Sequence, residues 1–157
     1  LFTRFGNDGN YLALDKSHSK ILLVETPVLL THELNAIKQH YADKITEIDT
    51  LFDVHASENA LRKGLDAIVA QAEAAMREGK HYIVLTDERM DEKRAAIPMI
   101  LAVSAVQTHL VKHKLRKKAA IIVRTAECIE VHACAVLIGV GATVVNPYLA
   151  EETLTER

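Results

Sequence analysis

Apolar and polar positions alternate along the chain in two different rhythms. Short, β-branched apolar runs predict strands at 45–52, 81–85, 119–123 and 142–145. Longer segments with apolar residues at helical spacing lie between them and predict helices at 58–78, 97–113 and 127–138. Four strands alternating with three helices predict an α/β fold of repeated β-α units on a parallel sheet. The sheet is expected to be an open, doubly wound one or part of a TIM-type barrel, because closing a full barrel takes about 250 residues.

The helices carry recognisable end signals. Ser57 is expected to cap the helix at 58–78, and Gly79 to end it. The helix at 97–113 is apolar on nearly every side in its first half, so we expect it to be buried on more than one face. A strand at 21–24 and a helix at 33–41 capped by Thr31 are expected upstream.

The ends of the chain differ in composition from its middle. Residues 1–20 are rich in Gly, Asn and Asp, which indicates a linker or a flexible lead-in segment. Residues 21–150 are interpreted as one α/β domain, and residues 151–157 as a polar tail. The chain begins at Leu1 rather than Met, and we expect it to be a piece of a longer polypeptide.

Composition narrows the function classes. The formal net charge of -2 argues against nucleic acid or an anionic membrane as partner. The apolar stretches are too short or too Gly-interrupted to span a bilayer, and no secretory signal pattern is present. Cys128 and Cys134 are expected on one helix about 240° apart, where they cannot easily bridge. Two free thiols favour a reducing, cytoplasmic compartment.

Polar residues follow each expected strand. The strand ends carry Asp53, Thr86 with Asp87, Arg124 with Thr125, and Asn146. Side chains at the carboxyl ends of neighbouring parallel strands converge, and ligand sites of α/β proteins form there. Each of these residue types, taken singly, is more often a loop starter or a helix cap. A small anion bound around Thr86, Arg124 and Asn146 therefore stays an alternative function.

Metal and phosphate signals are weak. His109 and His113 are spaced i, i+4, but no Glu follows the first His in the zincin order, and the basic stretch at 112–118 would repel a cation. Cys128 and His132 have the same spacing, with no third ligand in sight. We interpret the first pair as a solvated helix end and expect no metal. Residues 139–141 (Gly-Val-Gly) follow a helix and precede a strand, the reverse of a phosphate-binding loop.

Three ordered blocks resemble the central domain of the glutamate synthases. Residues 97–110 are similar to that family's IPALLAVxAVHHHL helix, residues 122–135 to LVVETGEAREVHHFA, and residues 139–150 to GYGADAxNPYLA. Shorter matches are residues 25–29 to SPVL and residues 86–87 to the start of SDRG. The resemblance covers residues 21–150.

The resemblance implies a role inside a larger enzyme. That enzyme makes two glutamates from glutamine and 2-oxoglutarate. An amidotransferase domain releases ammonia, which travels through an internal tunnel to a synthase domain carrying FMN and an iron–sulfur cluster. The central domain lies between them and spaces them. This implies no catalytic, cofactor-binding or metal residue in this chain. The resemblance implies the two neighbouring domains as partners and is compatible with a small reductase subunit as a further partner. The compartment that it implies is the cytoplasm or a plastid stroma.

Several positions depart from the family pattern. The three histidines of the family helix are Gln107-Thr108-His109 here, and the ETGEAR loop begins at Arg124, reversing a charge. We take Asp87, Arg124, His132 and Asn146 as candidate interface or tunnel-side residues. A third hypothesis for the function is a pure assembly module, which has no ligand and buries the long helix in an oligomer.

Overall fold

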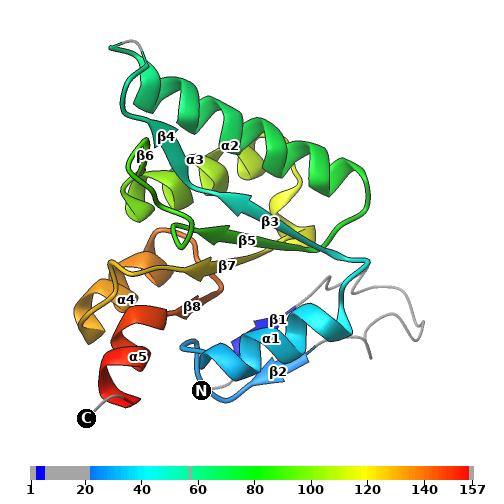
Figure 1. Ribbon diagram of the computed structural model, residues 1–157. Helices are drawn as coiled ribbons and strands as arrows, with labels where there is room; N and C mark the ends of the chain where they lie inside the picture. Colours follow the sequence, from blue (N-terminus) through cyan, green and yellow to red (C-terminus); the bar gives the residue numbers. More distant parts are fainter. Residues whose placement is uncertain (1–2, 6–21, 57, 156–157) are drawn as a thin grey trace.

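The structure, a computed structural model, describes residues 3–5, 22–56 and 58–155 (Figure 1). In chain order its strands and helices are β1 (Thr3–Phe5), β2 (Leu22–Val24), α1 (Thr31–His40), β3 (Ile45–Asp49), β4 (Leu51–Asp53), α2 (Ala60–Arg77), β5 (Tyr82–Thr86), β6 (Arg94–Ala96), α3 (Met99–Lys112), the short 3-10 helix η2 (Arg116–Lys118), β7 (Ala120–Arg124), α4 (Val131–Gly139), β8 (Val144–Asn146) and α5 (Tyr148–Thr155).

A four-stranded parallel sheet forms the centre, with strand order β3-β5-β7-β8. All five residues of β5 and of β7 are buried, as expected for strands covered on both faces. Residues 27–29 run beside β8, because Leu29 N–H donates to Val145 O (2.8 Å) and Val145 N–H donates to Pro27 O (2.8 Å). The predicted α/β fold with a parallel sheet is confirmed.

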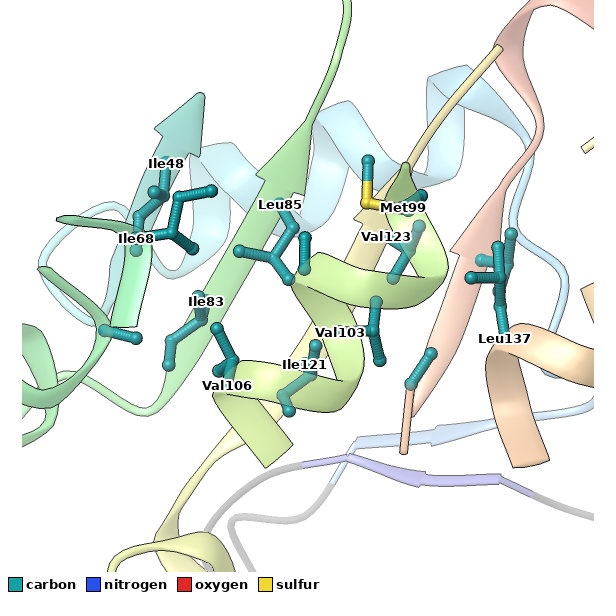
Figure 2. Close-up of a cluster of buried hydrophobic side chains, with 14 of the residues drawn as sticks. Ile48, Ile68, Ile83, Leu85, Met99, Val103, Val106, Ile121, Val123 and Leu137 are labelled. Atoms are coloured by element: carbon teal, nitrogen blue, oxygen red, sulfur yellow. The ribbon is translucent and has the colours of Figure 1, made fainter. Parts of the chain in front are cut away.

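Helices cover both faces of the sheet. One apolar cluster joins strand residues to α2, α3 and α4, and Figure 2 shows its members Ile83, Leu85, Ile121 and Val123 beneath α3. The alternate strand residues Tyr82, Val84, Ala120 and Ile122 face the other side and pack on Leu34 and Ile37 of α1. Because the strands follow one another in sequence order, the three crossover helices all lie on the first face.

The strand predicted at 45–52 is two strands. β3 ends at Asp49, and after Thr50 the chain enters β4, which pairs antiparallel with β6. Thr50 marks the break, since its N–H donates to Thr86 O (2.8 Å) and its own carbonyl accepts from Ile97 N–H (2.8 Å). β6 was not predicted, because three residues beginning with an exposed Arg lack a strand pattern.

The ends also differ from expectation. Residues 148–155 form α5, so the expected polar tail from residue 151 is largely helical; residues 156 and 157 lie outside the described part. In the expected lead-in segment, Thr3–Phe5 form β1, antiparallel to β2, and residues 1–2 and 6–20 lie outside the described part.

Helix starts were the least accurate predictions. Ser57, the expected cap of α2, lies outside the described residues, and Asn59 precedes the helix. Thr31 is the first residue of α1 rather than its cap. Gly79 adopts φ +84° just after α2, as its predicted stop requires. Among the described residues, no helix has the length and apolarity that a bilayer crossing requires.

Candidate functional site

The candidate residues from three neighbouring strand ends do converge. Arg124 of β7 lies beside Thr86 of β5 on one side and Asn146 of β8 on the other. Asp87 follows Thr86 directly, and Thr86, Asp87, Arg124 and Asn146 are all buried. The expected convergence at the carboxyl edge of the sheet is therefore confirmed for these positions. Asp53 is exposed at the end of β4, which is not part of the parallel sheet.

Arg124 is the centre of this strand-end cluster. Its Nε and Nη2 donate to the two carboxylate oxygens of Glu88, at 2.9 and 2.7 Å. Its Nη1 donates to Asn146 Oδ1 at 3.0 Å, and its guanidinium lies 5.0 Å from the centre of the Tyr148 ring. The hydrogen bond from Arg124 lowers the pKa of Glu88. The guanidinium charge is thus balanced by a bidentate carboxylate.

Asn146 joins the cluster to both ends of the domain. Its Nδ2 donates to Leu29 O at 2.9 Å and approaches Thr31 Oγ1 at 3.3 Å. Thr31 in turn donates from its hydroxyl (2.7 Å) and its backbone N–H (2.8 Å) to Glu151 of α5. Contacts across 120 residues of sequence therefore tie α1, β8 and α5 together.

Asp87 holds the loop that follows β7. Its carboxylate accepts the Thr125 hydroxyl at 2.5 Å and the Ala126 N–H at 3.1 and 3.2 Å. Burial, and then the charge and hydrogen bond of Asp87, raise the pKa of Tyr148 to about 12, so this phenol stays protonated at neutral pH. The groups that donate hydrogen bonds to the Asp87 carboxylate all belong to this chain.

The same loop explains why α4 starts late. The sequence predicts a helix from residue 127, but α4 begins at Val131. Thr125 Oγ1 accepts the Glu127 N–H at 3.1 Å, which closes a local turn. The Glu127 carboxylate accepts the N–H of Met99 at 3.1 Å with both oxygens, so it caps the first turn of α3 instead of starting its own helix. Burial raises the pKa of Glu127.

The cysteine geometry differs from the prediction. Cys128 lies in the loop rather than on α4, and its Sγ is 2.9 Å from the Sγ of Cys134; both thiols are free and buried. The predicted separation of about 240° was wrong because Cys128 is not on the helix that carries Cys134. Burial raises the pKa of Cys128, which keeps this thiol protonated and poorly nucleophilic. His132 is exposed on the first turn of α4 and does not join the strand-end cluster.

The turn at Gly141, before β8, allows the Gln107 side chain to pack closely against the backbone. Gly141 has φ +127°, and a Cβ there would lie 2.7 Å from the Gln107 side chain. Arg116 donates to Gln107 Oε1 and, at 2.9 Å, to Gly141 O. This turn follows the end of α4 and carries no helix N-terminus, in agreement with its interpretation as a helix stop.

The two cofactors implied by the resemblance do not fit these residues. An iron–sulfur cluster is held by thiolates, usually four, whereas this chain has two cysteines, both buried. The phosphate of FMN commonly binds amides at a helix N-terminus or an unpaired cation. Here the Gln107 side chain fills the space beside Gly141, and Arg124 is paired with Glu88.

What the strand-end cluster can do is therefore structural. Arg124 is paired with Glu88, and the Asp87 carboxylate is hydrogen-bonded by Thr125 and Ala126. Sequence reasoning missed Glu88, Tyr148, Glu151 and Thr31. Glu88 stands two residues past a strand end and could have been noticed; the contact of Thr31 with Glu151 has no local signal.

Comparisons with known proteins agree with this description. The family model described as "Glutamate synthase central domain" matches residues 1–157. The "Glutamate synthase [NADPH] large chain" of Azospirillum brasilense is 48% identical over 157 residues, 100% of this chain and 10% of that relative. The protein of the same name from Bacillus subtilis (strain 168) is 40% identical over 153 residues, 96% of this chain and 10% of the relative. The "Ferredoxin-dependent glutamate synthase, chloroplastic" of Spinacia oleracea is 36% identical over 156 residues, 98% of this chain and 10% of the relative.

The chain thus spans about a tenth of the length of the curated relatives it matches. The resemblance inferred from three sequence blocks is confirmed along the whole chain. The fold has a parallel sheet with a strand-end cluster whose polar groups bond to one another, and the family model matches the complete chain. This chain therefore belongs to the glutamate synthase central domain family.

Proposed function

We propose that the chain works as the connecting domain of a glutamate synthase, spacing an amidotransferase domain and an FMN synthase domain and backing the route of ammonia between them. The enzyme would convert glutamine and 2-oxoglutarate into two glutamates, with FMN and an iron–sulfur cluster held by other domains. The family match and the small share of each relative that this chain covers support the proposal. Its compartment would be the cytoplasm or, as the name of the Spinacia relative suggests, a plastid.

The observation that carries the proposal is an exposed apolar surface around the loop after β7. We call it the loop surface; its members are Ile100, Leu101, Ile129, Val131, Leu149 and Leu154. Ile129, Val131 and Leu154 are 76%, 86% and 74% exposed. Of these, Ile129, Leu149 and Leu154 line one common hollow. Grouped exposed apolar side chains mark interaction sites. α3 is buried on more than one face, as predicted, because it packs on β7, α2 and α4. Its outer side is exposed and carries Ile100 and Leu101.

Two hollows shape the loop surface. One of about 260 Å³ is lined by Ile129, Leu149 and Leu154 with Ala150 and Thr153. Another of about 160 Å³ lies between α3 and α4 and is lined by Ile100, Glu127, Ala133, Val136 and Leu137. Hollows with apolar walls beside protruding apolar side chains suit a neighbouring protein domain.

The strand-end cluster contacts the segments that carry the loop surface. Asp87 fixes the start of the loop at Thr125 and Ala126, and Arg124 contacts Tyr148 at the start of α5. We infer that Asp87, Arg124 and Asn146 act by holding the loop surface in place, whereas exposed His132 contacts the neighbouring domain directly.

The test uses the full-length enzyme that contains this domain. Val131→Asp and His132→Ala are compared with Val111→Asp, a control on α3 whose side chain is also exposed (54%, against 86% for Val131) but lies outside the loop surface. Glutamine hydrolysis and glutamate synthesis are measured together. We expect Val131→Asp to raise the ratio of hydrolysis to synthesis, and His132→Ala to raise it less. An unchanged ratio for Val131→Asp, or an equal change for Val111→Asp, would refute the connecting role of this surface.

A further inference from the structure

The opposite side of the domain holds a second cluster of chemically active side chains. His109 and His113 lie at the end of α3, and Glu73 of α2 lies against them. Their ligand-type atoms all lie within 4.8 Å of one another. The sequence shows only the two histidines, because the third residue comes from a helix 36 positions away. We propose that Glu73, His109 and His113 bind a divalent transition metal ion such as Zn²⁺.

The residue types and spacing match such an ion. Two histidines at i, i+4 on a helix present their rings on one face, and a carboxylate from a neighbouring helix completes a His₂Glu set. The two rings are stacked, with centroids 4.0 Å apart. Glu73 and His109 are partly exposed and His113 is exposed, so a fourth position can be taken by water.

The hydrogen bond of His113 leaves one of its ring nitrogens available. His113 Nδ1 is 2.9 Å from the backbone oxygen of His109, and since a carbonyl only accepts, this nitrogen carries the proton. In the neutral ring, Nε2 of His113 is then free to coordinate. A carbonyl partner on the other ring nitrogen is also what orients histidine ligands in metal sites.

Glu73 is divided between two partners. Its Oε1 accepts from Arg77 Nε (2.8 Å) and Nη2 (2.6 Å), whereas its Oε2 is 2.5 Å from His109 Nε2. A metal ion replacing the proton between Oε2 and Nε2 would turn both atoms into ligands and leave the Arg77 bonds intact. A glutamate side chain is ordinarily ionised at neutral pH, so the Glu73 carboxylate offers a charged oxygen ligand.

The local charge is mixed. Arg77 of α2 and the basic stretch at 112–118, which places Lys112 and Lys114 on either side of His113, oppose a metal ion. The ionised Glu73 and the negative end of the α3 dipole favour it, because the site lies at the carboxyl end of that helix. Selectivity would therefore come from imidazole coordination, which suits Zn²⁺ better than Mg²⁺ or Ca²⁺.

The test measures zinc binding to the full 157-residue chain by titration calorimetry and by the thermal unfolding midpoint. We expect one ion per chain and a midpoint that rises with zinc concentration. Glu73→Gln, His109→Ala and His113→Ala should each weaken binding about tenfold or more. His132→Ala, an exposed histidine elsewhere, should leave it unchanged, and Mg²⁺ should not substitute.

His113 is exposed, so its variant tests binding without a risk to folding. A wild-type chain that shows no saturable zinc effect would overturn the proposal. Binding that survives His113→Ala, or that is lost in His132→Ala, would place the ion elsewhere and would overturn it as well.

Discussion

The two edges of the parallel sheet carry polar clusters of opposite character. At the carboxyl edge, Asp87, Arg124 and Asn146 are buried, and their polar atoms are matched by the protein's own groups. On the side where α2 and α3 end, Glu73 and His109 are partly exposed and His113 is exposed, and the Nε2 of His113 keeps a lone pair available. The carboxyl edge, at which α/β proteins usually bind ligands, is closed here, because its polar groups are bonded to one another. The helix-end cluster on the other side is open, because it is in contact with solvent.

This difference has a physical cause. A charge at the carboxyl edge is surrounded by α1, α5 and the loop after β7, and a buried charge is tolerated only when it is paired and hydrogen-bonded. The helix-end cluster is partly solvated, so water can satisfy whatever the protein does not. Burial thus commits the first cluster to structure, whereas exposure leaves the second free for a ligand.

Asp87→Ala should have the largest effect, because it leaves Thr125, Ala126 and Tyr148 without their buried acceptor. We expect it to lower the free energy of unfolding by about 3 kcal/mol. The control Asp53→Ala, at an exposed strand end, should change it by less than about 0.5 kcal/mol. Urea unfolding followed by circular dichroism measures both. Equal losses for the two variants would mean that the carboxyl edge is not a closed network.

Gly141→Ala tests the packing on the open side of the sheet and should have an intermediate effect. A Cβ at φ +127° would meet the Gln107 side chain at 2.7 Å, so we expect a loss of about 2 kcal/mol. Gly139→Ala is the matched control, since a Cβ there meets nothing within 4 Å. The same urea experiment separates them, and a Gly141→Ala chain as stable as Gly139→Ala would contradict the close approach of Gln107.

Glu73→Gln should have the smallest effect on stability. The folded chain holds the pKa of Glu73 at about 2, below its ordinary value of 4.5, so its ionised form stabilises the fold above pH 4.5. That contribution is lost as the pH falls from 4.5 toward 2. Thermal unfolding midpoints of the wild type and Glu73→Gln should therefore differ slightly at pH 7 and converge near pH 2. A gap that widens on acidification would show that the sign of this linkage is wrong.

The scaffold could be predicted from local patterns, whereas the contacts of the site could not. Ile83, Leu85, Ile121 and Val123 alternate with residues facing α1, and this periodicity is visible in the sequence. Thr50 breaks a continuous β-branched run because its hydrogen bonds go to β5 and to Ile97, and no local signal marks that change of partner.

The polar clusters show the same division. Convergence of Arg124 and Asn146 followed from parallel strand topology alone. Their satisfaction by Glu88, Thr31 and Glu151 depends on loops and on α5, which was expected to be a tail. The third member of the helix-end cluster, Glu73, is likewise visible only once α2 packs on α3.

The most direct test of the contrast between the two edges is the thermal unfolding midpoint of the chain, titrated separately with phosphate and with zinc at constant ionic strength. A closed carboxyl edge and an open helix-end cluster predict a saturable rise with zinc and none with phosphate. A saturable rise with phosphate that disappears in Arg124→Met, together with no effect of zinc, would contradict the account and favour anion binding at the strand ends.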